Sequence, residues 1–268
     1  MSLFYLFILA IVQGITEFLP VSSSAHLVLL PGITGYEDQG LIIDVAVHVG
    51  TLLAVLLYFR HDILAIIAAF TLDLDNQSAE VCKNRRLGKM VVLASIPVVI
   101  AGLVMHIYWP DGIRDPLVIA VMTLVFGALL WWADQRHCDT KPLETLNQKA
   151  VLFIGVAQIL ALIPGTSRSG VTMTAGLLLG LNRVEAARFS LLLSIPAILG
   201  AGLLKGIEII QTGNAALGLD ALIGVALSFV MAYLAITIMM RWLKRSSFTP
   251  FVIYRMILGS VLLLYIML

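Results

Sequence analysis

Residues 221–240 read ALIGVALSFVMAYLAITIMM, a run of twenty residues without a charged side chain. A helix rises about 1.5 Å per residue, so a run of this length crosses the roughly 30 Å hydrocarbon core of a bilayer. Five other stretches are similarly apolar, and they are Leu41–Phe59, Met90–Tyr108, Pro116–Ala133, Phe189–Leu204 and Pro250–Leu268. The sequence therefore predicts an all-α polytopic membrane protein with six transmembrane helices.

The composition of the 268-residue chain excludes a soluble enzyme. Hydrophobic residues make up 60%, charged residues 12%, and the mean hydropathy is +1.01. A soluble domain carries about 25% charged residues, and half that share cannot cover a surface that faces water. The net charge of +1 gives no reason to expect nucleic acid as a partner. Cys82 and Cys138 lack the spacing of metal ligands, and we interpret both as incidental thiols.

Basic residues fall mainly on one side of the predicted spans. The segments that connect the spans on one side of the membrane hold thirteen Lys and Arg residues, and those on the other side hold two. The richer side of a membrane protein faces the cytoplasm. We therefore expect both termini on the opposite, outer side.

Two more apolar regions, Leu3–Leu30 and Ala150–Leu181, are interrupted by Pro, Gly and Ser. If each enters and leaves on one face, it forms a re-entrant helical hairpin, and each half of the chain holds one hairpin and three spans. Because three is odd, the second half is inverted relative to the first. We predict a single membrane domain over residues 1–268, an inverted repeat of about 1–135 and about 150–268, and hairpin tips that meet near the midplane.

The two interrupted regions also resemble each other locally. Residues 18–24 read FLPVSSS, and residues 162–168 read LIPGTSR. In each, apolar residues lead to a proline and then to small hydroxyl residues. This similarity supports the repeat and pairs Pro20 with Pro164.

The first interrupted region holds polar groups at membrane depth. Gln13 and Glu17 are four residues apart and share one helix face, and Ser22–Ser24 and His26 follow. An ionised carboxylate inside a bilayer costs roughly 3 kcal/mol or more, and such residues are functional by default. The alternative is structural, because Ser22–Ser24 can cap a helix while His26 is a satisfied core histidine.

The second interrupted region carries the sequence PGTSRSG at residues 164–170. Glycine lets the backbone approach a ligand closely, and hydroxyls at a helix start accompany amide N–H groups that bind anions. Arg168 adds a planar guanidinium that matches phosphate oxygens. Arg168 could instead pair with Glu17 and hold the hairpins together, and the two roles are compatible.

Three further polar residues lie inside predicted spans. Asp44 and His48 are one helical turn apart, but two ligands do not make a metal site, so we interpret them as interfacial or supporting groups. Arg255 lies in the last span, where it either extends to the membrane interface or contributes to an anion site.

These motifs resemble those of the undecaprenyl pyrophosphate phosphatases, bacterial membrane enzymes linked to bacitracin resistance. The matching segments are QGITEFLPVSSSAH at 13–26, PGTSRSG at 164–170 and SFTPFVIYR at 247–255, and the similarity covers nearly the whole chain. Gln13 stands where the family has Glu or Gln, and Ala25 stands where it usually has Gly.

The resemblance implies that the chain removes the terminal phosphate of undecaprenyl pyrophosphate and so recycles the monophosphate carrier for cell-wall glycan synthesis. It also implies the bacterial inner membrane, with the site facing the periplasmic or outer side. The residues that it makes essential are Glu17, Ser23, His26 and Arg168. The residues that we expect to bind the substrate are Gln13, Ser22, Ser24, Gly165, Thr166, Ser167, Ser169 and Arg255.

For this reaction we expect Ser23 to attack phosphorus, with His26 as its base and Glu17 behind the imidazole, as in a catalytic triad. His26 as the nucleophile is the alternative. The resemblance also implies a divalent cation, Mg²⁺ or Ca²⁺, which would bind Glu17 jointly with the pyrophosphate because the sequence has no dedicated ligand set. The expected partners are the polyprenyl pyrophosphate, membrane lipid and, in a homodimer, a second copy of the chain.

The competing hypothesis is a transporter or flippase for a polyprenyl phosphate or another anion. An inverted repeat with a polar site at the midplane suits transport equally well. The Ser23–His26 pair beside Arg168 separates the two hypotheses, because a transporter needs the positive charge of Arg168 but no nucleophile.

Overall fold

The computed structural model describes residues 2–36, 40–71, 78–109, 113, 115–136, 141–211 and 218–268, so Cys138 lies outside the described residues. The helices in chain order are α1 (Leu3–Thr16), α2 (Ser23–Thr34), α3 (Gly40–Tyr58), α4 (Arg60–Thr71), α5 (Ala79–Tyr108), α6 (Pro116–Gln135), η1 (Leu143–Thr145), α7 (Gln148–Ile159), η2 (Leu160–Leu162), α8 (Arg168–Leu178), α9 (Arg183–Gln211), α10 (Leu219–Leu243) and α11 (Thr249–Met267). Within these ranges the only β pairing is an isolated bridge between Lys141 and Leu181.

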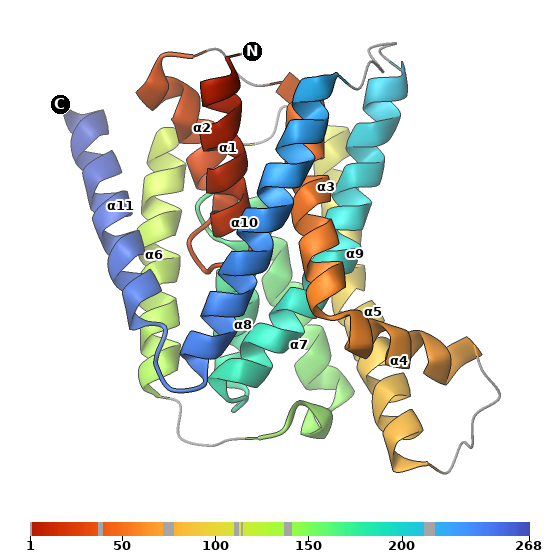
Figure 1. The fold of residues 1–268 in the computed structure, drawn as a ribbon. Helices are drawn as coiled ribbons and strands as arrows, with labels where there is room; N and C mark the ends of the chain where they lie inside the picture. Colours follow the sequence, from red (N-terminus) through yellow and green to blue (C-terminus); the bar gives the residue numbers. More distant parts are fainter. Residues whose placement is uncertain are drawn as a thin grey trace.

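Six helices, α3, α5, α6, α9, α10 and α11, are long and apolar enough to cross a membrane (Figure 1). They confirm the all-α fold and the six predicted spans. Two of them begin earlier than predicted, α5 at Ala79 rather than Met90 and α9 at Arg183 rather than Phe189. Charged residues fill these first turns, and hydropathy alone does not reveal a helix that continues past its apolar part. The helix α4 was not predicted because its apolar run, residues 63–70, is far shorter than the roughly 20 residues of a membrane span.

Local capping chemistry starts several helices. At α6, Asp115 accepts a hydrogen bond from the Leu117 N–H at 2.8 Å, and Pro116 occupies the first helical position, where an N–H would have no partner. At α7, Asn147 accepts from the Ala150 N–H at 2.9 Å. These caps fix the residues at which α6 and α7 begin.

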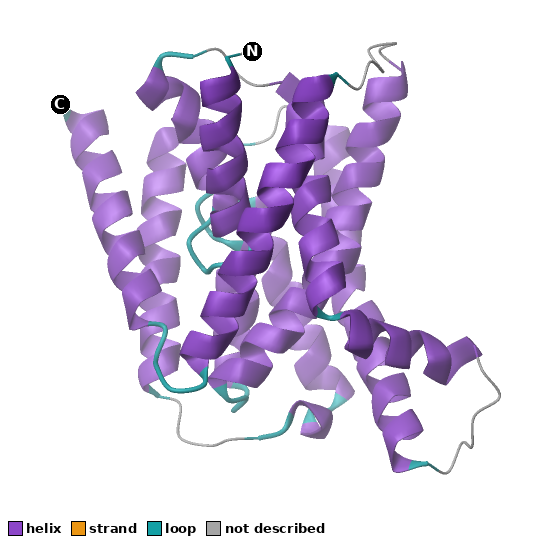
Figure 2. Cartoon of the chain, in the orientation of Figure 1, coloured by secondary structure: helices purple, strands orange, loops and turns teal. Residues whose placement is uncertain are grey.

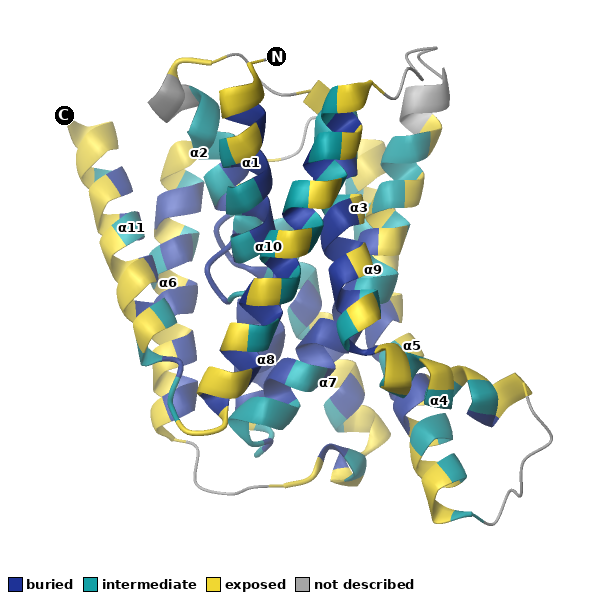
Figure 3. Cartoon of the chain, in the orientation of Figure 1, coloured by how far each residue is buried: buried dark blue, intermediate teal, exposed yellow. Residues whose placement is uncertain are grey.

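The two interrupted regions each fold as a helix, a loop and a second helix. The first hairpin is α1 and α2, and the second is α7, η2 and α8. Their loops lie beside each other at mid-height of the bundle (Figures 1 and 2). The Ser169 hydroxyl donates to the Leu19 carbonyl at 2.8 Å, and most residues of both loops are buried (Figure 3). The sequence correctly predicted that these two loops meet.

The second hairpin repeats the first at a constant interval. The first and second helices of this hairpin each begin 145 residues after their counterparts in the first hairpin. Ser22 and Ser167 therefore hold equivalent places, and Pro20 is matched by Gly165 rather than by Pro164. The sequence-based pairing of the two prolines is one residue out of register, because the helix cap and not the proline marks the shared start of α2 and α8.

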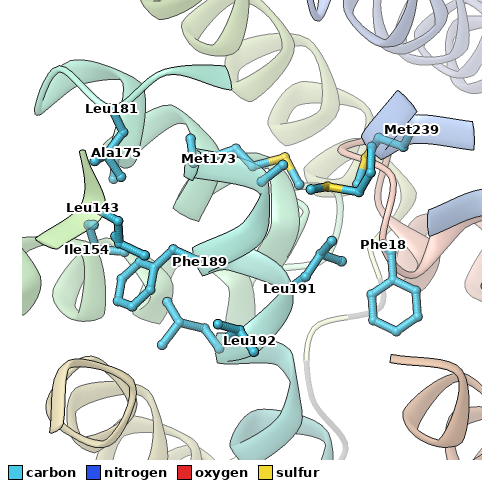
Figure 4. Packing of buried hydrophobic residues seen from close by; sticks show 14 of the residues in the cluster. Phe18, Leu143, Ile154, Met173, Ala175, Leu181, Phe189, Leu191, Leu192 and Met239 are labelled. Atoms are coloured by element: carbon cyan, nitrogen blue, oxygen red, sulfur yellow. The ribbon is translucent and has the colours of Figure 1, made fainter. Parts of the chain in front are cut away.

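Close helix packing holds the hairpins in place. The first hairpin packs on α10, which itself packs on α3, and the second contacts α5, α6 and α9. Gly50 allows the approach of α3 to α10, because a Cβ there would lie 2.3 Å from the Val225 carbonyl oxygen. Phe18 of the first loop belongs to the same buried cluster as Met173, Leu191 and Met239 (Figure 4).

Candidate functional site

Both loops end in a serine with an unusual backbone. Ser22 has φ 74° and Ser167 has φ 72°, and they are the only described residues other than glycine with positive φ. Each hydroxyl caps the helix that follows, accepting from the Ala25 N–H at 3.4 Å and from the Gly170 N–H at 3.1 Å. A non-glycine residue in this region is strained, and such strain clusters at functional sites. Ser22 therefore has the capping role that we considered for it, and Ser167 has the same role in the second loop.

Each cap is reinforced by a second serine. The Ser22 and Ser24 hydroxyls are hydrogen-bonded at 3.2 Å, and those of Ser167 and Ser169 are hydrogen-bonded at 3.1 Å. These four serines, predicted to bind the substrate, thus shape the two loops, and only Ser24 is exposed.

Glu17 is the centre of the site. Its Oε2 accepts from Ser23 Oγ at 2.6 Å and from Gln13 Nε2 at 3.0 Å, and its Oε1 accepts from Arg168 Nη2 at 3.1 Å. The Glu17 side chain is only 8% exposed, so a buried carboxylate is balanced by a cation from the other hairpin. The predicted grouping of Glu17, Ser23 and Arg168 is therefore present in the structure.

Arg168 has a second role besides this ion pair. It lines a cavity of about 510 Å³ together with Glu17 and His48. The remaining lining residues are apolar or glycine and come from α5, η2 and α9. The cavity thus joins a small charged patch to a long apolar wall, which suits an anionic head group on a hydrocarbon chain.

His48 is a lining residue that we interpreted from the sequence only as an interfacial or supporting group. Its Nε2 lies 3.9 Å from Glu17 Oε2, and its Nδ1 lies 2.7 Å from the main-chain oxygen of Asp44. The signal in the sequence was a histidine in an otherwise apolar span, one turn after an acidic residue. His48 therefore bonds to the Asp44 backbone and presents its other nitrogen to the site.

His26 does not take its predicted place behind Ser23. Its Nδ1 lies 2.7 Å from the Ser22 main-chain oxygen, and its Nε2 lies 2.5 Å from the Tyr254 hydroxyl. The predicted triad order is therefore wrong in this structure, because Ser23 bonds Glu17 directly. Since α2 begins at Ser23, the imidazole folds back on the preceding turn and leaves the Ser23 hydroxyl to the carboxylate.

Arg255 lies fully buried at the junction of the two loops and does not reach the membrane interface. All five of its N–H groups donate to main-chain carbonyls, and these belong to Pro20, Met122, Thr123, Gly165 and Thr166. Arg255 was expected to bind the substrate, but it has no remaining donor in this structure. It instead connects both loops to α6.

Gly165 and Thr166 act on the same junction. Gly165 has φ 91°, and a Cβ there would lie 2.4 Å from the Ile119 carbonyl oxygen, so only glycine fits. The carbonyls of both residues point to Arg255, whereas the Thr166 hydroxyl is buried without a hydrogen-bond partner. These two predicted binding residues thus set the shape of the second loop.

The residues around Glu17 offer few ligands for a metal. Among the described residues, no group of three His, Cys, Asp or Glu side chains could hold an ion. One orphaned atom does fit a hard cation, because Gln13 Oε1 is buried without a partner next to the Glu17 carboxylate. Two oxygens alone suit an ion that takes its other ligands from a bound pyrophosphate.

Comparisons with known proteins agree with this geometry. The family described as "Bacitracin resistance protein BacA" matches residues 6–261. An undecaprenyl-diphosphatase of Alteromonas mediterranea is 49% identical over 266 residues, covering 99% of each chain. An undecaprenyl-diphosphatase of Jannaschia sp. is 50% identical, and undecaprenyl-diphosphatase 2 of Stutzerimonas stutzeri is 51% identical, each covering 98% of both chains.

Proposed function

Since this chain belongs to the family of the bacitracin resistance protein BacA, we propose that it hydrolyses undecaprenyl pyrophosphate to undecaprenyl phosphate and phosphate. The observation that carries the proposal is a serine hydroxyl held 2.6 Å from a buried carboxylate that is itself paired with Arg168. A transporter would need Arg168 to bind the anion, but it would not need a serine hydroxyl held beside a carboxylate. The names of the relatives support hydrolysis, and nothing in the site favours transport.

Ser23 is the nucleophile in this proposal, and Glu17 takes the role of base that was predicted for His26. Ser23 Oγ passes its proton to Glu17 as the bond from Oγ to the terminal phosphorus forms. The bridging P–O bond breaks, and undecaprenyl phosphate leaves. Water then attacks the phosphoserine, Glu17 returns its proton to Ser23 Oγ as the Oγ–P bond breaks, and phosphate leaves with the two protons of the water.

Positive charge near the transferred phosphate comes from both hairpins. Arg168 can offer guanidinium N–H groups to phosphate oxygens from a position already fixed by Glu17 and by the Ser190 carbonyl, which accepts from Nη1 at 3.3 Å. The N-termini of α2 and α8 add amide N–H groups and the positive ends of two helix dipoles. Phosphoryl transfer depends on this kind of positioning and charge stabilisation.

The same site gives a divalent cation a place. Glu17 and Gln13 Oε1 would hold Mg²⁺ or Ca²⁺ together with pyrophosphate oxygens, and a bound cation would neutralise part of the phosphate charge. The protein residues then bind and orient the head group, while the apolar cavity walls receive the first part of the polyprenyl chain.

We further propose that the chain lies in the bacterial inner membrane with the site facing outward and the hairpins re-entrant. The 13-to-2 distribution of basic residues supports this orientation. In intact cells, an impermeant thiol reagent should label Trp109→Cys, next to the outer end of α5, and should leave Cys82 and Cys138 unlabelled. Labelling of the native cysteines alone would contradict the orientation.

The decisive experiment measures phosphate release from purified protein supplied with undecaprenyl pyrophosphate in detergent, with and without Mg²⁺ or Ca²⁺. We expect release by the wild type and none by Ser23→Ala, which should still bind the lipid because Arg168 and the amides are unchanged. A wild type that binds the lipid but releases no phosphate under any of these conditions would refute the proposed function.

A further inference from the structure

The helix α11 contacts the first hairpin through Tyr254, a residue for which no role was predicted from the sequence. Its hydroxyl lies 2.5 Å from Nε2 of His26. The two rings are stacked, with centroids 5.7 Å apart and planes at 10° to each other. The contact joins residues that are 228 positions apart in the chain.

The two hydrogen-bond partners of His26 determine which of its ring nitrogens carries the hydrogen. The Ser22 carbonyl can only accept, so His26 Nδ1 carries a hydrogen and donates it. In a neutral imidazole the lone pair then lies on Nε2, where it accepts the hydrogen of the Tyr254 hydroxyl. Tyr254 thus completes the hydrogen bonding of the ring and fixes its plane.

We propose that Tyr254 is a positioning residue: its hydroxyl holds the lone pair on His26 Nε2, so that Nδ1 donates to the carbonyl of Ser22, the residue next to the nucleophile Ser23. The claim about turnover rests on the proposed phosphatase activity, whereas the claim about the ring does not. The next residue, Arg255, supplies the rigid support, because its five hydrogen bonds fix the rotation of α11 about its axis.

A membrane anchor is the simpler role for an exposed tyrosine, since tyrosines are enriched at bilayer interfaces. Tyr254 is 42% exposed, but an anchor needs neither a short bond to an imidazole nor stacking on it. Tyr265 on the same helix is 76% exposed and provides the matched control. Removing a hydroxyl from each residue separates anchoring from positioning.

The test combines nitrogen NMR with kinetics on full-length protein in lipid nanodiscs. Histidine-¹⁵N labelling at about pH 8.5, two units above the ordinary histidine pKa of about 6.5, reports which ring nitrogen is protonated. The His26 signal is assigned by its loss in His26→Gln. We expect a protonated Nδ1 and a hydrogen-bonded, unprotonated Nε2 in the wild type.

In Tyr254→Phe, which keeps the aromatic ring, the Nε2 resonance should move to that of a nitrogen without a donor. The kcat should fall about tenfold with KM nearly unchanged, as expected for the loss of one hydrogen bond that positions a reacting group. Tyr265→Phe should change neither the resonance nor the kcat.

A wild-type His26 protonated on Nε2, or an Nε2 resonance that is the same in Tyr254→Phe, would overturn the proposal. If Tyr254→Phe does not fold, the wild-type spectrum still decides the protonation of His26. A wild type without phosphatase activity would refute the proposed function, while the spectra would still test the contact.

Discussion

The two hairpins have the same backbone design but carry different chemistry. Each ends its loop in a serine of positive φ that caps the next helix, and each pairs that serine with a second hydroxyl. Yet the residue after the cap is Ser23 in the first hairpin and Arg168 in the second, and the place of Glu17 is taken by Leu162. In the proposed mechanism the nucleophile and base thus come from one hairpin and Arg168 from the other, so neither hairpin alone forms the site.

Two glutamines at equivalent positions of the hairpins, Gln13 and Gln158, also differ in what they contact. Gln13 and Gln158 are both fully buried, and both leave Oε1 without a partner. Gln13 donates to Glu17, whereas Gln158 donates to the Ala94 carbonyl of α5 at 3.5 Å. The first glutamine therefore serves the site, and the second serves helix packing.

Ser23→Ala should have the largest effect, because it removes the function assigned to the first hairpin alone. The kcat should fall about 1,000-fold or more, to background, since no other hydroxyl contacts the carboxylate among the described residues. Phosphate release from purified protein measures this effect. Ser24→Ala removes a neighbouring hydroxyl that bonds only Ser22 and should keep most activity, and equal losses in both variants would contradict the assignment.

Arg168→Lys tests the contribution of the second hairpin. Lysine keeps the positive charge but loses the planar fork that contacts Glu17 and the Ser190 carbonyl together. The kcat/KM should fall roughly tenfold to 1,000-fold, the range expected for one donor to a transition-state oxyanion. Near-normal kcat/KM would mean that Arg168 acts only as a point charge.

Arg255→Lys tests whether both loops depend on one support. Lysine has three donors for five carbonyls, so at least two carbonyls at the junction lose their partner. The free energy of unfolding should fall by about 2–6 kcal/mol, from roughly 1–3 kcal/mol for each of two buried acceptors left unsatisfied. Thermal unfolding in detergent measures this loss, and an unchanged midpoint would show that the loops are held by other contacts.

Ser22→Ala and Ser167→Ala should have the smallest and most similar effects on stability. Each removes one helix cap, which contributes about 1 kcal/mol. Thermal unfolding of the two variants should therefore give midpoints close to each other. A loss confined to one variant would show that the shared backbone geometry is not equally important in the two hairpins.

The fold could largely be predicted from the sequence because a bilayer imposes a simple requirement on length and polarity. Six apolar runs gave six helices, and the broken runs gave two loops that meet. The Glu17–Arg168 contact was considered as the structural alternative for Arg168, since a buried carboxylate requires a cation or a polar partner. The polar first turns of α5 lay outside what hydropathy can reveal, and the apolar run of α4 was too short to count as a span.

The partners of His26 and Arg255 could not be predicted for a different reason. Tyr254 follows His26 by 228 residues, and the carbonyls that Arg255 binds belong to three separate segments. Main-chain carbonyls leave no signature in a sequence, because every residue has one. An intramembrane arginine without a nearby acidic residue therefore looked like a ligand for an anion rather than a partner of the backbone.

The position of Arg255 has a consequence for biosynthesis. A chain is made from its N-terminus, so both loops enter the membrane before the helix that holds them has left the ribosome. The carbonyls of Pro20, Gly165 and Thr166 therefore lack their Arg255 donor until α11 has been made. We therefore expect a nascent or truncated chain that lacks α11 to be inserted yet inert.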